Sequence, residues 1–321
     1  MQQETSNPVI AVRNLRKSFG SVEAVKDVSF EVESGQVLGL LGPNGAGKTT
    51  TINMISTLVQ IDAGEATVDG FDVQDQPEVV RQLIGLAGQS AAVDEKLTAR
   101  ENLELFGRLY KIPRPERRER VEELIDRFDL SDFADRPAST YSGGERRRLD
   151  VVAALVAEPP AVFLDEPTTG LDPRSRSELW DTVKSLASSG VAIVLSTQYL
   201  EEADRLADKI LVIDQGRIVA QGTPETLKRD LERDVLEVQV TTMADLDAAR
   251  DLVGSDVTID TETRHIEIPV HDGANRALDL LRKLQDGGVS ISSFQLRQPT
   301  LDDVFLAITG SAATTSEEAR T

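Results

Sequence analysis

A glycine-rich segment at residues 42–49, Gly-Pro-Asn-Gly-Ala-Gly-Lys-Thr, limits the folds open to this chain more than any other feature. It follows the continuous apolar run 37–41 (VLGLL), which is typical of a buried strand in a sheet covered on both faces. A helical pattern begins after it, at about Lys48. The segment fits G-x-x-x-x-G-K-[ST] in the strand-to-helix context that supports this motif. The sequence therefore predicts an α/β fold with a phosphate-binding loop.

The phosphate-binding loop offers three kinds of contact to a nucleotide. Its glycines let backbone N–H groups close around phosphate oxygens at the positive end of a helix. Lys48 reaches the β- and γ-phosphates, and the Thr49 hydroxyl ligates Mg²⁺. A chance glycine-rich turn is the alternative, but the flanking strand and helix argue against it. We expect ATP and Mg²⁺ as cofactors, held by Gly42, Pro43, Asn44, Gly45, Ala46, Gly47, Lys48, Thr49 and Thr50.

A second apolar run ends in two acidic residues. Residues 161–166 read Ala-Val-Phe-Leu-Asp-Glu, so a buried strand would deliver both carboxylates to the carboxyl edge of the sheet, where ligands bind. Alone this is weak evidence, because acidic residues often begin the turn after a strand; beside the phosphate loop it becomes strong. We predict that Asp165 holds Mg²⁺, directly or through water, and that Glu166 polarises the attacking water as a general base.

A third motif, Tyr-Ser-Gly-Gly-Glu at 141–145, precedes a predicted helix. Ser142, Gly143 and Gly144 would present free N–H groups at the start of that helix, and such groups form an anion site. The simpler interpretation is that Ser142 only caps the helix. Taken by itself, the motif favours the simpler interpretation.

Strands and helices alternate through the larger part of the chain, which indicates an α/β layered domain over 1–229. The remaining strands are expected at 9–13, 25–32, 191–195 and 210–213, and the helices at 98–130, 174–187 and 199–207. Pro113 and Pro115 should break the first of these helical stretches in two.

After about residue 230 the pattern changes to that of a small second domain, 230–310. Strands at 235–241, 256–260, 264–270 and 289–297, with helices at 244–253 and 274–285, give the order β-α-β-β-α-β of a ferredoxin-like α+β domain. Leu301, Val304, Phe305 and Ile308 then form one apolar helical stripe, which must be buried on the same chain or on a partner. Burial there would hold two subunits together and tune turnover, so we expect an accessory or regulatory domain without catalysis of its own; a passive stabilising appendage is the alternative. Residues 311–321 are expected to be a disordered tail.

Composition narrows the partners that such a chain can have. Lys plus Arg is 35 and Asp plus Glu is 55, giving a net charge of −20, which disfavours nucleic acid and an anionic membrane surface. Cysteine is absent from the sequence, so disulfides and thiolate metal sites are excluded. No apolar run reaches 18 residues and the N-terminus lacks a signal pattern, so we expect no membrane span and no secretion. Excess acid with little lysine is typical of a salt-rich cytoplasm or, alternatively, of a GC-rich genome.

The order GPNGAGKTT, YSGGE, VFLDEP and GLDP along the chain resembles the ATP-binding cassette (ABC) family. The resemblance implies a P-loop NTPase cassette whose helical subdomain, about 90–150, carries YSGGE as the signature loop. It also implies that Gln89 contacts Mg²⁺ or the attacking water and that Asp172 lies in a loop at a dimer interface. Phe19 matches the aromatic residue that stacks on adenine, with a core aromatic as an equal alternative. In the implied head-to-tail homodimer, Ser142, Gly143 and Gly144 complete the partner's nucleotide site.

YSGGERRRLD, STQYLEEADRLADKI and PTLDDVFLAITG narrow the resemblance to the drug-resistance branch, which includes the ATPase subunits of daunorubicin and doxorubicin exporters. This implies a peripheral subunit on the cytoplasmic face that hydrolyses ATP to power export of a small hydrophobic compound, a drug or a lipid-like molecule. A separate membrane permease would bind the transported molecule, and this chain would not. A soluble ABC ATPase of DNA repair or translation is the alternative; the single phosphate loop and the acidic surface argue against it. A non-catalytic regulator is disfavoured by Glu166.

Two positions depart from the family pattern. Gln198 stands where the family usually has a histidine, and glutamine cannot accept and pass on a proton, so we expect Gln198 only to orient phosphate during catalysis. Glu145 stands where glutamine is commoner, and its carboxylate is expected to point away from a neighbour's γ-phosphate. The run Arg146–Arg148 is expected on a solvated helix face, with a dimer or phosphate contact as the alternative. His265 and His271 are expected on the surface without a role.

Overall fold

The computed structural model describes residues 7–89, 92–231, 233–254, 257–271 and 273–307. The chain divides into two compact units, Met1–Pro224 and Glu225–Thr321. This boundary lies a few residues before residue 229, where the sequence pattern places the end of the first domain.

A largely parallel sheet forms the centre of the first unit. Among the described residues it has six strands in the order β10-β9-β3-β8-β7-β6. All neighbours are parallel except the edge strand β10, which pairs antiparallel with β9. The strands are β3 (Val37–Leu41), β6 (Ile84–Ala87), β7 (Ala161–Asp165), β8 (Ala192–Thr197), β9 (Lys209–Asp214) and β10 (Arg217–Gly222). The buried strands expected near 37, 161, 191 and 210 are therefore neighbours in one sheet.

Successive residues of the central strands belong to different hydrophobic cores. In β7, Ala161 and Phe163 belong to one core, whereas Val162 and Leu164 belong to the other. Helix α1 (Lys48–Ile55) lies on the first face, while α6 (Pro173–Ser188) and α7 (Leu200–Leu206) contribute to the second. Because both faces are covered, the strands are continuously apolar, which is the reason for the uninterrupted runs in the sequence.

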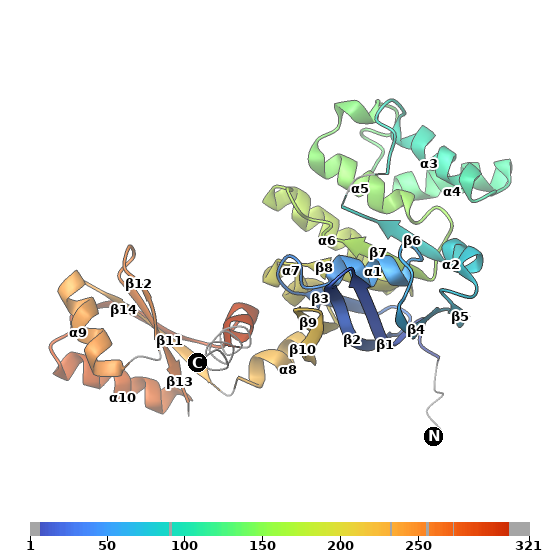
Figure 1. Cartoon of the computed structure of the whole chain (residues 1–321). Coiled ribbons are helices and arrows are strands. Elements are labelled where there is room, and N and C mark those ends of the chain that lie inside the picture. Colours follow the sequence, from blue (N-terminus) through green and yellow to red (C-terminus); the bar gives the residue numbers. More distant parts are fainter. Residues whose placement is uncertain (1–6, 90–91, 232, 255–256, 272, 308–321) are drawn as a thin grey trace, which may run out of the picture. The chain divides into compact units, whose positions relative to one another are not determined.

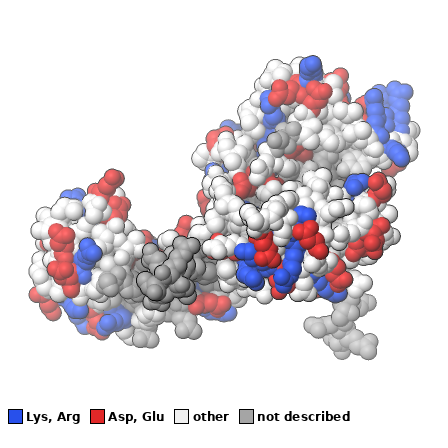
Figure 2. Space-filling model, viewed as in Figure 1, with Lys and Arg blue, Asp and Glu red and all other residues white. Residues whose placement is uncertain are grey.

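A second, antiparallel sheet of the first unit runs in the order β2-β1-β4-β5. Its strands are β1 (Ile10–Phe19), β2 (Val22–Val32), β4 (Ala63–Val68) and β5 (Phe71–Asp72). The sequence pattern predicts no element between 56 and 97, and β4, β5, α2 (Pro77–Leu83) and β6 lie there. On the face shown in Figure 2, acidic and basic side chains lie beside one another over the region of β1 and β2. Arg16 of β1 and Glu23 of β2 form one ion pair between these strands, at 3.9 Å.

Three helices form a separate layer of the first unit, away from β1 and β2 (Figure 1). These are α3 (Ala99–Leu109), α4 (Arg114–Arg127) and α5 (Gly143–Ala153), with a short 3-10 turn at Ala138–Thr140. Helix α3 ends at Leu109, and α4 begins after Pro113, its N-cap, with Pro115 in its first turn, so the helical stretch is divided in two as the sequence predicts. This helical layer carries the YSGGE motif at the start of α5.

The second unit contains one antiparallel sheet among its described residues, in the order β12-β13-β11-β14. Its elements after α8 (Pro224–Arg229) are β11 (Asp234–Val240), α9 (Met243–Val253), β12 (Thr258–Asp260), β13 (His265–Val270), α10 (Gly273–Asp286) and β14 (Ile291–Arg297). Both α9 and α10 pack on one face of the sheet, through residues such as Leu246 and Leu284. This order and packing confirm the ferredoxin-like fold.

Residues 301–307 form a helix after β14. Leu301 and Val304 of the apolar stripe are buried, and Phe305 is half-buried. Ile308 and the tail 311–321 lie outside the described residues. The first part of the stripe is thus covered within the chain.

Candidate active site

The glycine-rich segment turns from β3 into α1 through backbone that only glycine accommodates. Gly47 has a φ of 106° and caps α1, and a Cβ at this position would lie 2.5 Å from the Ala24 carbonyl oxygen. A Cβ at Gly42 would lie 2.1 Å from the Ile213 carbonyl oxygen. Gly47 offers no side-chain acceptor to the first N–H groups of α1, so they stay available to phosphate oxygens.

Lys48 lies inside this loop with its ammonium turned back onto the chain. Its side chain is 4% exposed, and Nζ donates to the carbonyl oxygens of Gly42 at 2.7 Å and Pro43 at 3.1 Å. Nζ also lies 3.6 Å from Glu166 Oε1. Burial lowers the pKa of Lys48, and the nearby carboxylates of Glu166 and Asp165 oppose that shift. The loop thus holds a cation where the motif predicts the terminal phosphates.

The acid pair after β7 meets the phosphate loop across β8. Thr49 Oγ1 donates to Asp165 Oδ1 at 3.0 Å, and the Ser196 hydroxyl donates to the same oxygen. The parallel register places Ser196 directly opposite Asp165. Thr49 and Asp165 therefore bring two hard oxygen donors to one point, and such donors fit Mg²⁺.

Glu166 leaves the end of β7 in a left-handed backbone conformation, with a φ of 48°. Its N–H donates to the carbonyl oxygen and the hydroxyl of Ser196, each at 3.1 Å. Thr169 Oγ1 donates to its carboxylate at 3.4 Å. Because a non-glycine residue at positive φ costs about 1–2 kcal/mol, these contacts must hold it in place.

A cavity of about 420 Å³ lies beside the acid pair. Its lining consists of Gln89, Gly143, Arg146, Arg147, Glu166, Thr169, Gly170 and Leu171. Gln89 follows β6, and its Nε2 lies 3.5 Å from Thr49 Oγ1, so it faces the predicted magnesium ligands. The structure therefore brings Lys48, Thr49, Gln89, Asp165 and Glu166 together.

The signature loop forms a complete helix cap. Ser142 Oγ accepts the N–H of Glu145 at 3.2 Å, and the Glu145 carboxylate accepts the N–H of Ser142 at 2.8 Å. Arg136 also binds that carboxylate, at 2.9 Å. Burial works to raise the pKa of Glu145, but the Ser142 and Arg136 contacts hold it below its usual value. The Glu145 charge is thus directed at its own loop and at Arg136.

Phe19 and Gln198 are among the predicted site residues that do not line this cavity. The Phe19 ring at the end of β1 is 52% exposed, which excludes a core role, and the Lys17 ammonium lies 5.4 Å from its centre. Gln198 is half-buried directly after β8. Each remains a predicted nucleotide contact.

Arg147 contradicts the expectation that the run Arg146–Arg148 lies on a solvated face. Its side chain is buried, and it binds carbonyl groups around the cavity. Sequence analysis also missed Ser196, which bonds both acidic residues. Ser196 and Thr197 are polar residues at the end of an apolar strand, and that signal could have indicated their place in the site.

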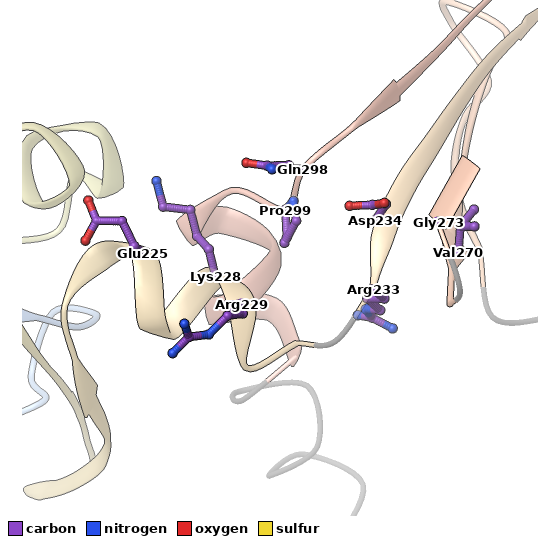
Figure 3. Close-up of a pocket in the computed structure, with 9 residues that line it drawn as sticks. All are labelled: Glu225, Lys228, Arg229, Arg233, Asp234, Val270, Gly273, Gln298 and Pro299. Carbon is purple, nitrogen blue, oxygen red and sulfur yellow. The ribbon is translucent and has the colours of Figure 1, made fainter. Parts of the chain in front are cut away.

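A different cavity, of about 460 Å³, lies in the second unit (Figure 3). Lys228 and Arg229 come from α8, while Asp234 begins β11 and Gly273 begins α10. In Figure 3, Lys228 and Arg229 point in different directions from α8, and Asp234 brings a carboxylate, so the lining does not focus positive charge at one point. The cavity therefore lacks the arrangement that the first unit offers to a triphosphate.

The fold and the site define a P-loop ATPase of the ATP-binding cassette type, and comparison with known proteins agrees. Residues 25–169 match the family described as ABC transporter, and residues 222–309 match the C-terminal domain of DrrA1-3-like ATP-binding proteins. The chain belongs to the ABC transporter ATP-binding family, in the branch of the daunorubicin and doxorubicin resistance ATP-binding proteins.

Similar proteins match along nearly the full chain. The daunorubicin resistance ATP-binding protein DrrA2 of Streptomyces coeruleorubidus is 49% identical over 301 residues, which cover 92% of this chain and 93% of that protein. The doxorubicin resistance ATP-binding protein DrrA of Mycobacterium tuberculosis (strain ATCC 25618 / H37Rv) is 43% identical, over 94% and 93% of the two chains. A solved ATP-binding subunit of an ABC transporter is 30% identical, with a TM-score of 0.63, over 70% of this chain and 93% of that one.

Within the described ranges, the structure has no helix with the length and apolar character needed to cross a bilayer. The described ranges also contain no cluster of three or more His, Cys, Asp or Glu side chains that could hold a metal ion by themselves. A magnesium site built from Thr49, Asp165 and the nucleotide's own phosphates needs no such cluster.

Proposed function

We propose that this chain is the ATP-hydrolysing subunit of an exporter, and that it drives a small hydrophobic compound through a separate membrane permease. The observation that carries the proposal is the similarity to resistance proteins over both units, in a chain whose Thr49, Asp165 and Glu166 meet at one sheet edge. Relatives also include the linearmycin resistance ATP-binding protein LnrL of Bacillus subtilis, 36% identical, and a Nod factor export ATP-binding protein I of Ralstonia nicotianae, 37% identical. These names differ in the compound concerned, so the proposal extends to drugs and lipid-like molecules.

The hydrolytic step follows from the side chains around the phosphate loop. Bound Mg²⁺ would neutralise charge on the β- and γ-phosphates, and Thr49, Asp165 and Gln89 are placed to hold it. An incoming γ-phosphate would compete for Lys48, which now lies 3.6 Å from Glu166 Oε1. Release from Lys48 would leave the Glu166 carboxylate free to accept a proton from the attacking water. Gln198 would orient the phosphate and Phe19 would stack on the adenine.

A head-to-tail dimer would complete each nucleotide site. Ser142, Gly143 and Gly144 of one chain would supply N–H groups to the γ-phosphate bound at Lys48 of the other. A dimeric ABC cassette solved with ADP and Pi, 27% identical with a TM-score of 0.60 over 67% of this chain, supports the pairing of two cassettes. Asp172, which caps α6 through the N–H groups of Arg174 and Ser175, would lie near that interface.

A hollow of about 230 Å³ is the surface we assign to the permease. Leu58, Phe106 and Tyr110 contribute to its lining. Leu58 is 62% exposed, and Leu109 in the neighbouring helix α3 is 67% exposed, so this part of the first unit offers apolar side chains to a partner. Contact through such side chains needs no attraction between the acidic chain and the membrane, and it would place the chain on the cytoplasmic face.

The test is export by cells that express this chain with and without a candidate membrane protein from a neighbouring gene. We expect efflux of daunorubicin, or of a fluorescent lipid, only when both proteins are present and Lys48 is intact. Lys48→Ala is the matched variant, because it removes the phosphate-binding cation without changing the hollow. Active ATP hydrolysis without efflux and without co-purification of a membrane protein would overturn the proposal in favour of a soluble ATPase.

A further inference from the structure

Arg147 is a buried cation that touches the backbone of the site at three points. It lies on α5 with 9% of its surface exposed. Its guanidinium donates to the carbonyl oxygens of Gly88 at 2.5 Å, Pro167 at 2.9 Å and Asp165 at 3.3 Å. These carbonyls belong to two loops that are far apart in the sequence, so one side chain joins both loops to the signature helix.

The three carbonyls lie next to Gln89 and Glu166, two residues proposed to act in hydrolysis. Gly88 directly precedes Gln89, and Asp165 and Pro167 flank Glu166 on both sides. Glu166 has a positive φ, and such a conformation persists only where surrounding contacts fix it. Hydrogen bonds to the carbonyl groups of both neighbouring residues supply such contacts, in addition to those from Ser196.

Asp150, one helical turn along α5, balances the Arg147 charge. Its carboxylate accepts from Arg147 Nη1 at 3.0 Å and from the Ala92 N–H at 2.7 Å. Burial raises the pKa of Asp150, and the Ala92 N–H and the Arg147 charge oppose that rise. Hydrogen bonds of the Arg147–Asp150 pair thus connect α5 to Gly88 and Ala92, which precede and follow Gln89 in the sequence.

The ion pair also lies between two hollows of the first unit. Arg147 lines the 420 Å³ cavity beside Glu166, whereas Asp150 lines the 230 Å³ hollow assigned to the permease. Two side chains in contact thus connect the hollow assigned to the permease with the backbone on both sides of Glu166.

We propose that Arg147 is a positioning residue for ATP hydrolysis, which sets Gln89 and Glu166 in one geometry with Asp150 as its charge partner. The proposal rests on the roles proposed for Gln89 and Glu166. Arginine suits this task because its planar fork spans several acceptors at once, whereas a lysine ammonium is a single point of charge. The bonds of Arg147 go to Asp150 and to backbone carbonyls, and none of them reaches the phosphate loop or the carboxylates of Asp165 and Glu166.

The test compares Arg147→Lys with Arg148→Lys in the full chain. Both variants keep the charge and shorten the reach, but Arg148 pairs with Glu178 and lies outside the cavity. We expect Arg147→Lys to lower kcat at saturating Mg-ATP by about tenfold, because small displacements of catalytic groups cost up to about 100-fold. The KM for ATP should change less than about twofold, since the phosphate loop is untouched. Arg148→Lys should keep the wild-type kcat.

A double-mutant cycle separates positioning from a general loss of structure. If Arg147 acts partly through Gln89, Arg147→Lys should lower kcat less in a Gln89→Ala background than in the wild type. Equal effects in both backgrounds, or a wild-type kcat in Arg147→Lys, would overturn the proposal.

A second variant covers the case in which Arg147→Lys unfolds. The double variant R147M/D150L replaces both charges by apolar side chains, and such replacements of buried ion pairs often keep stability. We expect the double variant to stay folded with a somewhat lowered melting temperature, because the carbonyl groups and the Ala92 N–H lose their partners, and we expect kcat to fall at least about tenfold. A folded double variant with a wild-type kcat would overturn the proposal. Glu166→Gln, measured in parallel, tests the proposed function independently, because its kcat must fall whatever Arg147 does.

Discussion

The two units use similar helices and strands but place their polar residues differently. In the first unit, β3, β8 and β7 run parallel, so their carboxyl ends share one edge, where Thr49, Asp165 and Ser196 meet. In the second unit, neighbouring strands run antiparallel, so their carboxyl ends alternate between the two edges. Strand direction therefore decides where side chains from separate strand ends can gather into a site.

In the second unit, charged side chains from neighbouring strands instead form a cluster across one face of the sheet. Arg297 of β14 binds the carboxylates of Glu237 on β11 and Glu267 on β13, the latter at 3.3 Å. It also binds Asp303, in the following helix, at 2.6 Å. One cation thus joins three strands and a helix. We therefore propose that the buried charges at the parallel sheet edge of the first unit serve hydrolysis, whereas the Arg297 cluster stabilises the structure of the second unit.

The largest effect should come from Lys48→Ala. We expect loss of tight ATP binding and of hydrolysis, since the γ-phosphate loses its principal cation inside a closed loop. The matched variant is Lys283→Ala in the second unit, where the ammonium donates to the Leu252 carbonyl oxygen at 2.7 Å. Binding of a fluorescent ATP analogue checks both variants. Wild-type affinity for ATP in Lys48→Ala, or weakened ATP binding in Lys283→Ala, would contradict the assignment of ATP binding to the first unit alone.

Glu166→Gln should keep ATP binding and lose turnover by about 100-fold or more, because an amide cannot serve as a general base. With hydrolysis blocked, ATP should hold two chains together through Ser142, Gly143 and Gly144. Sedimentation at saturating ATP and high salt measures the dimer, and the same sample with ADP is the control. Monomer under both conditions would contradict the head-to-tail dimer.

Sequence reasoning succeeds here where one local pattern determines the structure. The phosphate loop and the acid pair follow continuous apolar runs, and α9 and α10 have clear helical periodicity, so their places could be predicted. Strand β4 could not be predicted from the sequence, because only Ala66 and Val68 of its six residues are buried and it contains no continuous apolar run. An antiparallel strand with one solvent-exposed face has a weaker hydrophobic pattern in the sequence than a parallel strand that is buried on both faces.

Arg147 shows a different limit of sequence reasoning. Three consecutive arginines suggest a solvated face, but residues 147, 151 and 154 share one side of a helix, and Val151 and Ala154 are apolar. That spacing, with Asp150 of opposite charge three residues on, could have indicated a buried pair. What the sequence cannot show is that the acceptors are carbonyls of Gly88, Asp165 and Pro167, because backbone groups carry no sequence signature.

Arg297→Met tests the structural role of charge in the second unit. We expect a loss of about 2 kcal/mol from the stability of this unit, since three carboxylates lose their shared cation in a half-buried setting. Hydrogen exchange of the β11, β13 and β14 amides measures this locally, while the kcat for ATP should stay at the wild-type value. Faster exchange in the strands of the first unit, or a lowered kcat, would contradict the separation of roles.

The same cluster predicts a dependence of stability on pH. Burial works to raise the pKa of Asp303, but Arg297 and the Thr300 N–H outweigh it and hold the pKa below its usual value. A carboxyl group with a lowered pKa stabilises the fold above its unfolded pKa of about 3.9 and loses that contribution as the pH falls further. The protection factors of the β14 amides, which are exchange rates corrected for the pH dependence of exchange in an unstructured chain, should therefore fall below about pH 4, and Asp303→Asn should remove part of this pH dependence.

The smallest effect should come from Glu145→Gln, which restores the residue commoner in the family at this position. The side-chain oxygen of glutamine can still accept the Ser142 N–H, so the cap of α5 is kept. The ion pair with Arg136 is lost, but both side chains are partly exposed, and such a pair contributes at most about 1 kcal/mol. We expect kcat within about twofold of the wild type, measured beside Glu145→Ala, which also removes the cap. A several-fold rise of kcat in Glu145→Gln would instead indicate that the Glu145 carboxylate acts on the γ-phosphate bound to the partner chain and not on its own loop. The negative charge of Glu145 would then belong with the catalytic groups of the first unit.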